Sequence, residues 1–248
     1  MLGIRSEKLT SVEHCFFRRN GGVSSGLYVS LNCSRFVGDD EQLVFQNLDI
    51  ARKHLGVSKL VTLQQAHGRQ CIVADCKTES GSIADAIVTK EKDIAIGILT
   101  ADCAPILFLD EINEVIGAAH AGWRGIMSGI IISTVQTMLN VGAVLDNIKV
   151  AVGPCILQKS YIVDEDFKEH LEERQNCFGF INSNMCFDLP KCCFYELLET
   201  GIEKNNIDLM MVDTYADPEN YFSYRFAKNN SDGVCGRQIS AISLKKWK

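Results

Sequence analysis

The sequence has few of the features that mark linkers, membrane segments or exported proteins. It contains only 4 prolines in 248 residues, and no Gly/Ser-rich linker, low-complexity tract or repeat divides it. No segment offers the roughly 20 uninterrupted apolar residues that a membrane helix needs, and the N-terminus lacks the apolar core of a signal peptide. We therefore expect a single domain, residues 1–248, with no membrane span and a cytoplasmic location.

Concentrated positive charge is also scarce. The formal net charge is −6, and the densest basic run is Lys245-Lys246 near the C-terminus. Proteins that bind nucleic acid or anionic membranes usually present a basic patch. The charge therefore argues against both as the main partner, and nothing in the sequence indicates an oligomeric state.

Paired cysteines are missing as well. The 11 cysteines are odd in number and irregularly spaced, and they include no C-x-x-C pair. In a chain of this length without a signal peptide, that pattern does not favour a disulfide framework. Most of these thiols are expected to be small buried hydrophobic groups, so the question is which cysteine differs from the rest.

Short apolar runs rich in Ile, Val and Leu predict more strands than helices. Strands are expected at residues 59–65, 70–75, 83–89, 94–100, 106–109, 115–120, 148–152 and 209–212. Helical spacing and capping residues predict helices at 40–56, about 126–142, 164–175 and 188–204, with loops at 215–236. Because the strands and helices do not alternate regularly, we expect an α+β fold in which mixed β-sheets pack against helices.

Two segments depart from the pattern of ordinary core strands. Asp102 lies in the most apolar region, where burying an unpaired carboxylate costs several kcal/mol, and Cys103 follows it directly. His120 ends a strand and is followed by small residues, glycines and Arg124 at the start of an expected helix. Backbone N–H groups and a guanidinium at that position favour an anion.

His67 has a similar setting, at a strand end beside a glycine. Strand ends on one side of a sheet can bring His67, Cys103 and His120 together. Two imidazoles and a thiolate suit Zn²⁺ and leave a fourth position open. The same residues allow two other interpretations, a Cys–His nucleophile pair and simple structural burial.

The N-terminal run Phe16 to Ser24 has the composition of a glycine-rich anion loop, with Arg19 at its centre, but lacks the Gly-Lys-Ser/Thr ending of a P-loop. A hairpin turn at Asn20-Gly21 is the other interpretation.

Three sequence blocks carry a family resemblance. LQQAHG occupies residues 63–68, LTADCAP residues 99–105 and AAHAGWRG residues 118–125. FRRNGGVS at 17–24 and SLN at 30–32 precede them, and GPCI at 153–156, FSYR at 222–225 and GR at 236–237 follow. With these motifs, nearly the whole chain resembles the YfiH family, also called the laccase-domain or polyphenol-oxidase-like family. Its members have been described as purine nucleoside phosphorylases.

The resemblance implies that His67, Cys103 and His120 are metal ligands, with zinc usual and copper reported. It implies phosphorolysis of adenosine, inosine and methylthioadenosine, together with deamination of adenosine, so purine nucleosides and phosphate are the expected partners. The implied fold is an α+β one shared with a deamidating toxin domain. Arg124 and Arg19 are candidates for binding the phosphate, and Asp102 is expected either to orient a ligand or to hold its loop.

The chain departs from the family pattern at two positions. Asp213-Thr214 stands where members often have Cys-Thr, and Phe226 stands where they often have a second arginine. Neither position belongs to the three ligands, but both bear on substrate preference. Three rival functions remain: a Cys–His hydrolase or amidase that edits peptidoglycan, a copper-dependent phenol oxidase, and a non-catalytic role. The 5 histidines, with no His-x-His pair, do not favour the oxidase.

Overall fold

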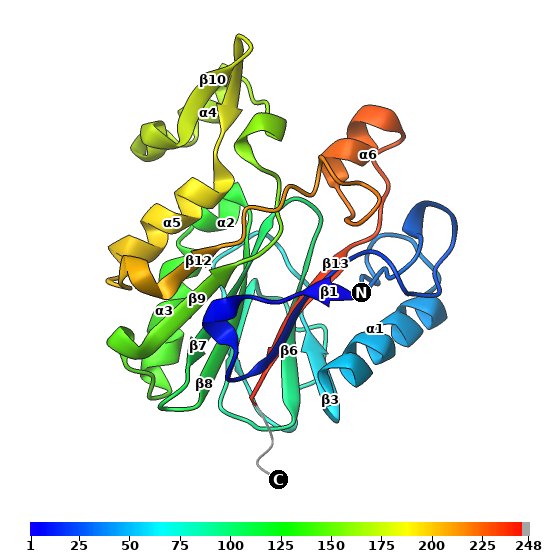
Figure 1. Ribbon diagram of the computed structural model, residues 1–248, viewed down its shortest axis with the longest axis vertical. Helices are drawn as coiled ribbons and strands as arrows, with labels where there is room; N and C mark the ends of the chain where they lie inside the picture. Colours follow the sequence, from blue (N-terminus) through cyan, green and yellow to red (C-terminus); the bar gives the residue numbers. More distant parts are fainter. Residues whose placement is uncertain (245–248) are drawn as a thin grey trace.

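The centre of the protein lies between two β-sheets that face each other (Figure 1). The computed structural model describes residues 1–244. Within that range, one sheet has the order β1-β2-β13-β6-β3, with bounds Gly3–Ile4, Glu13–Phe17, Gln238–Ser243, Ile94–Thr100 and Lys59–Thr62. The other has the order β12-β9-β7-β8-β5-β4, with bounds Ile207–Leu209, Ile148–Val152, Ala104–Asp110, Val115–Ala121, Ala86–Thr89 and Cys71–Ala74.

Both sheets combine parallel and antiparallel pairs. Strand β6 pairs with β3 in parallel and with β13 antiparallel, while β5 pairs with β4 in parallel and with β8 antiparallel. Side chains alternate between the two faces of a strand. Ile96 and Ile98 of β6 and Ile116 and Ala118 of β8 therefore meet in one buried cluster between the sheets, which we call the inter-sheet core.

Helices cover the outer face of each sheet. Helix α1, Glu41–Leu55, packs on the sheet that contains β2, β6 and β13. On the other side, α2 (Trp123–Met127), α3 (Ile130–Asn140) and α5 (Leu189–Glu199) pack on β7, β8 and β9. The chain thus forms four layers, a helix, two sheets and a group of helices.

Two smaller units stand at one end of the sheets (Figure 1). One contains α4, Glu165–Glu169, and the antiparallel pair of β10, Phe178–Ile181, with β11, Asn184–Phe187. The other is α6, Tyr224–Asn230. These units, together with the loop that follows β2, surround the end of the inter-sheet core where the candidate site lies.

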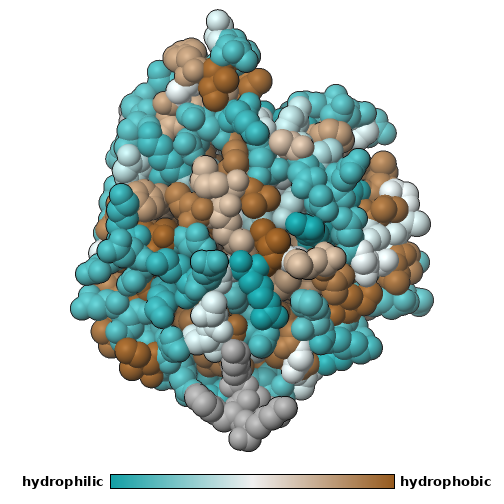
Figure 2. Space-filling view, viewed as in Figure 1, coloured by the Kyte–Doolittle hydropathy of each residue, from teal (hydrophilic) through white to brown (hydrophobic). Residues whose placement is uncertain are grey.

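The prediction of an α+β fold with mixed sheets packed against helices in a single domain is confirmed. The helix expected at 40–56 is α1, with Asp40 capping its N-terminus and Gly56 in the left-handed conformation that ends it. Among the residues described, no helix is long and apolar enough to cross a membrane. Figure 2 shows hydrophilic residues over most of one face, with hydrophobic residues in small groups.

The helical predictions need four corrections. The helix expected at about 126–142 is divided into α2 and α3 at Gly129, whose φ is 88°, and the helix expected at 188–204 ends at Glu199. The helix expected at 164–175 starts correctly at the Asp164 cap but ends at Glu169. Leu171 is fully buried and has φ −131° and ψ 36°, outside the helical region, and a 3₁₀ segment, Glu172–Cys177, follows. The segment expected as loop at 215–236 contains α6, which Ser223 caps. A helix that buries only one residue leaves almost no periodic signal.

The strand predictions are mostly confirmed but miss the chain ends. Strands β6 and β9 match the expected ranges. The strand expected at 209–212 runs instead over 207–209, because pairing with β9 ends there and Met211 takes a left-handed conformation. Strands β2 and β13, which are central in their sheet, were not predicted. Their buried residues include His14, Gln238 and Ser240, which hide the apolar pattern of a strand.

Candidate metal centre

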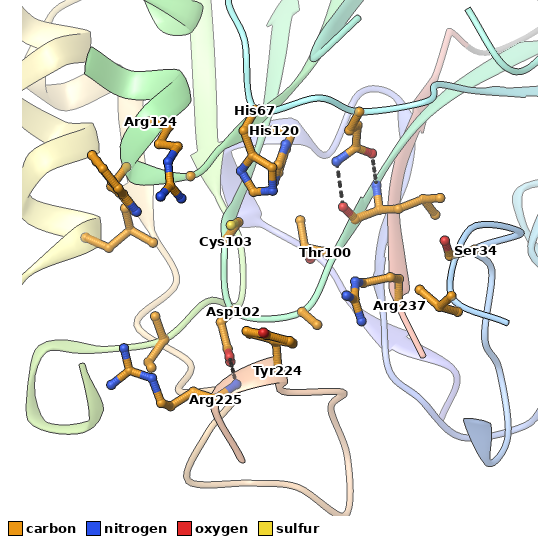
Figure 3. A pocket seen from close by; sticks show the side chains of 18 of the residues that line it. Ser34, His67, Thr100, Asp102, Cys103, His120, Arg124, Tyr224, Arg225 and Arg237 are labelled. Carbon is orange, nitrogen blue, oxygen red and sulfur yellow. Dashed lines mark hydrogen bonds between the residues drawn. The ribbon is translucent and has the colours of Figure 1, made fainter. Parts of the chain in front are cut away.

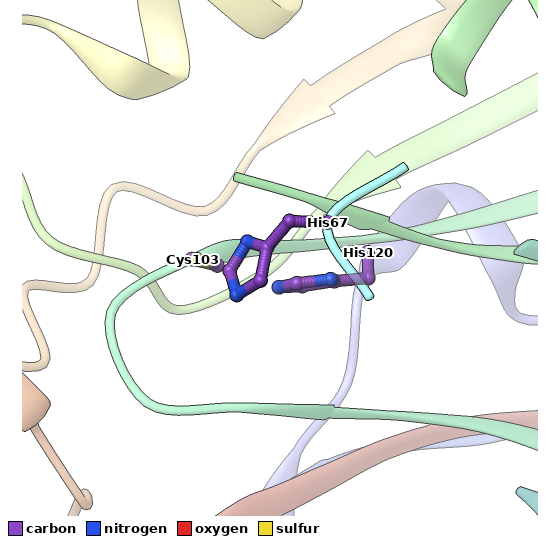
Figure 4. A group of neighbouring side chains, drawn as sticks. All are labelled: His67, Cys103 and His120. Carbon is purple, nitrogen blue, oxygen red and sulfur yellow. The ribbon is translucent and has the colours of Figure 1, made fainter. Parts of the chain in front are cut away.

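His67, Cys103 and His120 meet at the open end of the inter-sheet core (Figure 4). One possible ligand atom from each residue lies within 4.8 Å of the others, and the two imidazole centroids are 4.6 Å apart. Among residues 1–244 this is the one group of three or more His, Cys, Asp or Glu side chains close enough to hold a metal ion. Donor atoms around a tetrahedral zinc ion lie roughly 3.5 Å apart, so small side-chain rotations suffice to close the set.

Strand pairing explains why distant positions converge. Strands β7 and β8 are antiparallel, with Pro105 opposite His120 and Ala104 opposite Ala121. Cys103, just before β7, therefore lies beside the end of β8. By alternation along β8, His120 faces the same side as Ile116 and Ala118, towards the inter-sheet core.

Asp85 holds two of the three candidate ligands. Its Oδ1 accepts hydrogen bonds from the His120 ring at 2.8 Å and from the His67 backbone N–H at 2.9 Å. Its Oδ2 accepts from the N–H groups of Gly68 at 2.7 Å and Ala66 at 3.2 Å. Because Nδ1 of His120 is bound to Asp85, Nε2 is the ring nitrogen left for a metal, as in carboxylate–histidine–metal sites.

The electrostatics of the site follow from this arrangement. Burial opposes ionisation of Asp85, but its hydrogen bonds to His120, Gly68 and Ala66 outweigh burial and lower its pKa. For His67, burial lowers the pKa to about 4, and the nearby His120, Arg124 and Arg237 contribute to that shift. His67 is therefore neutral at neutral pH, which is the form that binds metals. For His120, burial is outweighed by Cys103 and Asp85, which raise its pKa to about 9.

Gly122 leaves the space that the donor atoms occupy. A Cβ atom added there would lie 2.9 Å from Cys103 Sγ and 3.0 Å from His67 Nδ1. The backbone at Gly122, with φ −82° and ψ 163°, is one that any residue can adopt. Its lack of a side chain is therefore needed for space and not for backbone conformation.

Asp102 holds a loop and not a metal ligand. Its Oδ1 accepts from Thr214 Oγ1 at 2.8 Å, and its Oδ2 accepts from the Arg225 backbone N–H at 2.6 Å. Asp102 also has φ 87°, in the left-handed region. Of the two roles expected from the sequence, the structure supports the structural one. Asp102 connects the turn that carries Cys103 to the N-terminus of α6.

A cavity of about 470 Å³ opens on the three candidate ligands (Figure 3). This volume is within the usual range for small-molecule sites. Three arginines line it, and Arg124 and Arg237 lie on opposite sides of the imidazoles in Figure 3. Its walls also carry aromatic and apolar side chains, among them Phe36, Val37, Trp123, Tyr161 and Tyr224. The site therefore combines a metal-ligand set, cationic groups and flat hydrophobic surfaces.

The two arginines expected at an anion site have different positions. Arg124 lines the cavity, with its guanidinium 4.3 Å from the centroid of the Trp123 ring. Arg19 is not among the lining residues. It donates hydrogen bonds to the carbonyl oxygens of Val29 at 2.8 Å and Pro218 at 2.7 Å. The structure therefore does not bring Arg19 into the cavity with Arg124, and its guanidinium fixes two loops.

The two departures from the family pattern lie outside the cavity lining. Asp213 accepts a hydrogen bond from Ser160 Oγ at 2.7 Å and so holds the loop that precedes Tyr161. Phe226 packs with Tyr215, with ring centroids 6.0 Å apart. Either residue would act on a ligand only through the loops that it supports.

Three site residues were missed from the sequence. Asp85 interrupts an apolar strand segment, the same signal that singled out Asp102, and it faces His120 across the β5–β8 pair. Arg225 and Arg237 lie in the FSYR and GR motifs but had no assigned role. Arg225 donates to the Ile162 carbonyl, and Arg237 donates to those of Cys235 and Gly236.

We predict that Gly122→Ala weakens metal binding by about tenfold or more. The added methyl group displaces Cys103 Sγ or His67 Nδ1, and small displacements of ligands reduce affinity strongly. The metal dissociation constant, measured by competition with a coloured chelator, tests this. Gly68→Ala is the matched control, since its Cβ would meet Asp85 Oδ2 at an ordinary 3.6 Å. Equal affinities of Gly122→Ala and the unmodified protein would argue against the assigned ligand positions.

Comparisons with known proteins extend over nearly the whole chain. A family described as multi-copper polyphenol oxidoreductase laccase matches residues 13–245. The chain is 30% identical over 241 residues to a purine nucleoside phosphorylase of Rickettsia prowazekii, covering 95% of this chain and 97% of that protein. It is also 30% identical to the purine nucleoside phosphorylase YfiH of Escherichia coli, covering 94% of each.

Solved structures show the same fold. The crystal structure of a Neisseria meningitidis protein has a TM-score of 0.87 at 28% identity and covers 99% of this chain and 100% of that chain. The crystal structure of Bacillus licheniformis YfiH has a TM-score of 0.86 at 25% identity and covers 95% and 94%. The likeness therefore includes both sheets and the three segments that supply the candidate ligands.

Proposed function

Because the chain belongs to the laccase-domain (YfiH) family, we propose that it is a zinc-dependent purine nucleoside enzyme. The reaction is phosphorolysis of adenosine, inosine and methylthioadenosine to the free base and ribose 1-phosphate (methylthioribose 1-phosphate for methylthioadenosine), with deamination of adenosine as a second activity. Relatives named purine nucleoside phosphorylase, at about 30% identity over nearly the whole chain, support the reaction class. The observation that carries the proposal is the His67–Cys103–His120 set at the base of a cavity lined by guanidinium groups.

The donor set fits one metal ion and leaves one side open. Two imidazoles and a thiol form a borderline-soft set, which favours zinc and also accepts copper. Asp85 fixes the tautomer of His120, and Gly122 leaves room for the donor atoms. A zinc ion held there would supply Lewis acidity and lower the pKa of a water molecule.

The protein side chains supply binding and orientation. In phosphorolysis, a phosphate oxygen forms a bond to C1′ of the ribose while the bond from C1′ to the base breaks, and the base leaves with the electron pair. Arg124 faces the cavity beside His67, and we assign it to the phosphate, whose charge it attracts and whose oxygens it can orient. In deamination, water attacks C6 of adenine and ammonia leaves.

A second candidate function has a specific observation in its favour. Asp85, His120 and Cys103 are arranged as an orienting carboxylate, a base and a nucleophile, with Asp85 Oδ1 2.8 Å from His120 Nδ1. A cysteine hydrolase or amidase, such as one acting on peptidoglycan, would use this geometry without a metal. The third residue, His67, has no role in that mechanism, so the geometry favours the metal-dependent enzyme.

A copper-dependent phenol oxidase finds less support. A laccase needs a trinuclear copper centre in addition to a single copper site. The chain has 5 histidines, of which two are in the candidate centre. His14 binds the backbone of Ser6, and His54 packs on Phe17. No second metal-ligand group is present in the part of the chain that the structure describes.

The proposed function is tested by metal analysis and a nucleoside assay on the purified protein. We expect about one zinc per chain. With phosphate, adenosine should give adenine, together with hypoxanthine from the inosine that deamination forms, and ribose 1-phosphate should equal the sum of the two bases. Inosine should give hypoxanthine and ribose 1-phosphate. Without phosphate, adenosine should give inosine only. Metal-loaded protein that turns over none of the three nucleosides would contradict the proposal, and a stripped protein with full activity would contradict its zinc dependence.

A further inference from the structure

One buried hydroxyl beside the candidate centre has no hydrogen-bond partner. Among residues 1–244, two buried side-chain polar atoms lack one, Thr100 Oγ1 and Arg18 Nε. Thr100 is only 2% exposed and lines the cavity, whereas Arg18 is not a lining residue. Burying a hydroxyl without a partner is costly, and a valine would fill the same space without that cost.

Strand geometry places the Thr100 side chain at the same end of the inter-sheet core as the metal-ligand set. Thr100 ends β6, and alternation puts its side chain on the same face as Ile96 and Ile98, in the inter-sheet core. His120 lies on the facing side of that core, at the same end. Figure 3 shows Thr100 between Cys103 and Arg237, within the ring of side chains around the cavity.

We propose that Thr100 is a substrate-binding residue whose hydroxyl hydrogen-bonds the oxygen nucleophile of the reaction. That oxygen belongs to phosphate in phosphorolysis or to water in deamination, so the inference rests on the proposed function. A threonine hydroxyl offers one donor and two acceptor sites. By accepting a hydrogen bond from the O–H of phosphate or water, Thr100 directs a lone pair of that oxygen towards C1′ or C6. The missing partner is thus the substrate itself.

Two substitutions separate this role from a structural one. Thr100→Val keeps the shape and removes the hydroxyl, and Thr100→Ser keeps the hydroxyl. We expect Thr100→Val to raise the melting temperature of the substrate-free protein by about 2–4 °C, because an unpaired buried polar group is removed. Its kcat/KM should fall by roughly 10–100-fold, while Thr100→Ser stays close to the unmodified enzyme.

Thr89→Val is the matched control. Thr89 is fully buried at the end of β5 that lies away from His120. Its hydroxyl donates to the Ala74 carbonyl at 2.7 Å and accepts from the Glu91 N–H at 3.0 Å. The same substitution there removes satisfied hydrogen bonds. We expect it to lower the melting temperature and to leave the metal content and kinetic constants unchanged.

The source of the oxygen is decided by two measurements on metal-loaded protein. If Thr100 binds phosphate, Thr100→Val should weaken phosphate binding in calorimetry about tenfold and raise the KM of phosphate but not that of the nucleoside. If Thr100 binds water, phosphate binding stays unchanged and kcat for adenosine deamination falls. If the unmodified enzyme is active and the Thr100→Val variant is equally active, the inference about Thr100 is overturned while the proposed function stands. The inference is also overturned if the melting temperature falls in both Thr100→Val and Thr100→Ser. Inactive unmodified enzyme would instead contradict the proposed function, and phosphate calorimetry would still test Thr100.

Discussion

Replacing Cys103 by alanine is expected to remove most of the bound metal and to lower nucleoside turnover by about 10³-fold, or roughly 4 kcal/mol in activation free energy. The variant leaves only two imidazoles, from His67 and His120, around a site that then has two open positions. Zinc content by mass spectrometry and adenosine phosphorolysis would be measured on the same preparation. The stability of the metal-free protein should change little, because Cys103 is only half-buried at the edge of the cavity.

Cys71→Ala is the control for loss of a half-buried thiol. Cys71 lies on β4 and packs beside the α3 helix, and it is not among the cavity residues. Alkylation then distinguishes the two candidate functions. A metal-bound thiolate should react with iodoacetamide faster after chelation, whereas a free nucleophile should react equally before and after. Full zinc occupancy in Cys103→Ala would exclude Cys103 as a ligand.

The strongly apolar strands of the fold could be predicted from the sequence, and the strands near the two chain ends could not. Strands β6 to β9 are short apolar runs with clear ends, and α1 has both a capping aspartate and a terminal glycine. Strands β2 and β13 contain buried polar residues whose partners come from other parts of the chain, as when Gln238 binds the backbone of Phe222. A pattern of local hydropathy does not contain that information.

The same distinction applies to the site. His67, Cys103 and His120 stand out because each interrupts or ends an apolar strand beside small residues, and the structure brings them together. Arg19 was a second candidate beside Arg124 because both lie in glycine-containing motifs, although only Arg124 was expected to open a helix. Their roles are separated only by tertiary contacts, since the carbonyl oxygens of Val29 and Pro218 hold the Arg19 guanidinium. Asp85 interrupts an apolar segment as Asp102 does, but only the tertiary contact with His120 across the β5–β8 pair shows its role.

Asp85→Asn is expected to weaken metal binding by at least 10–100-fold, the usual effect of losing a group that orients one ligand. Asp85 orients two. Its two oxygens accept from four donors, namely the His120 ring and the backbone N–H groups of Ala66, His67 and Gly68. An asparagine has one acceptor oxygen, so whichever way its amide turns, its NH₂ group faces two of these donors. The loop that carries His67 or the His120 ring must then move.

Asp110→Asn separates this effect from simple loss of stability. Asp110 ends β7 about 20 Å along the strand from the Cys103 turn and is also fully buried. It too accepts from four donors, the backbone N–H groups of Ile112, Asn113 and Val144 and the Asn113 side chain. Both substitutions should therefore lower the free energy of unfolding of the metal-free protein by about 2–4 kcal/mol. Only Asp85→Asn should also raise the metal dissociation constant, measured by chelator competition well below the melting temperature. If the two variants bound metal equally well, the carboxylate of Asp85 would serve the fold alone, and the rigidity of the centre would have to come from Gly122 and the strand ends.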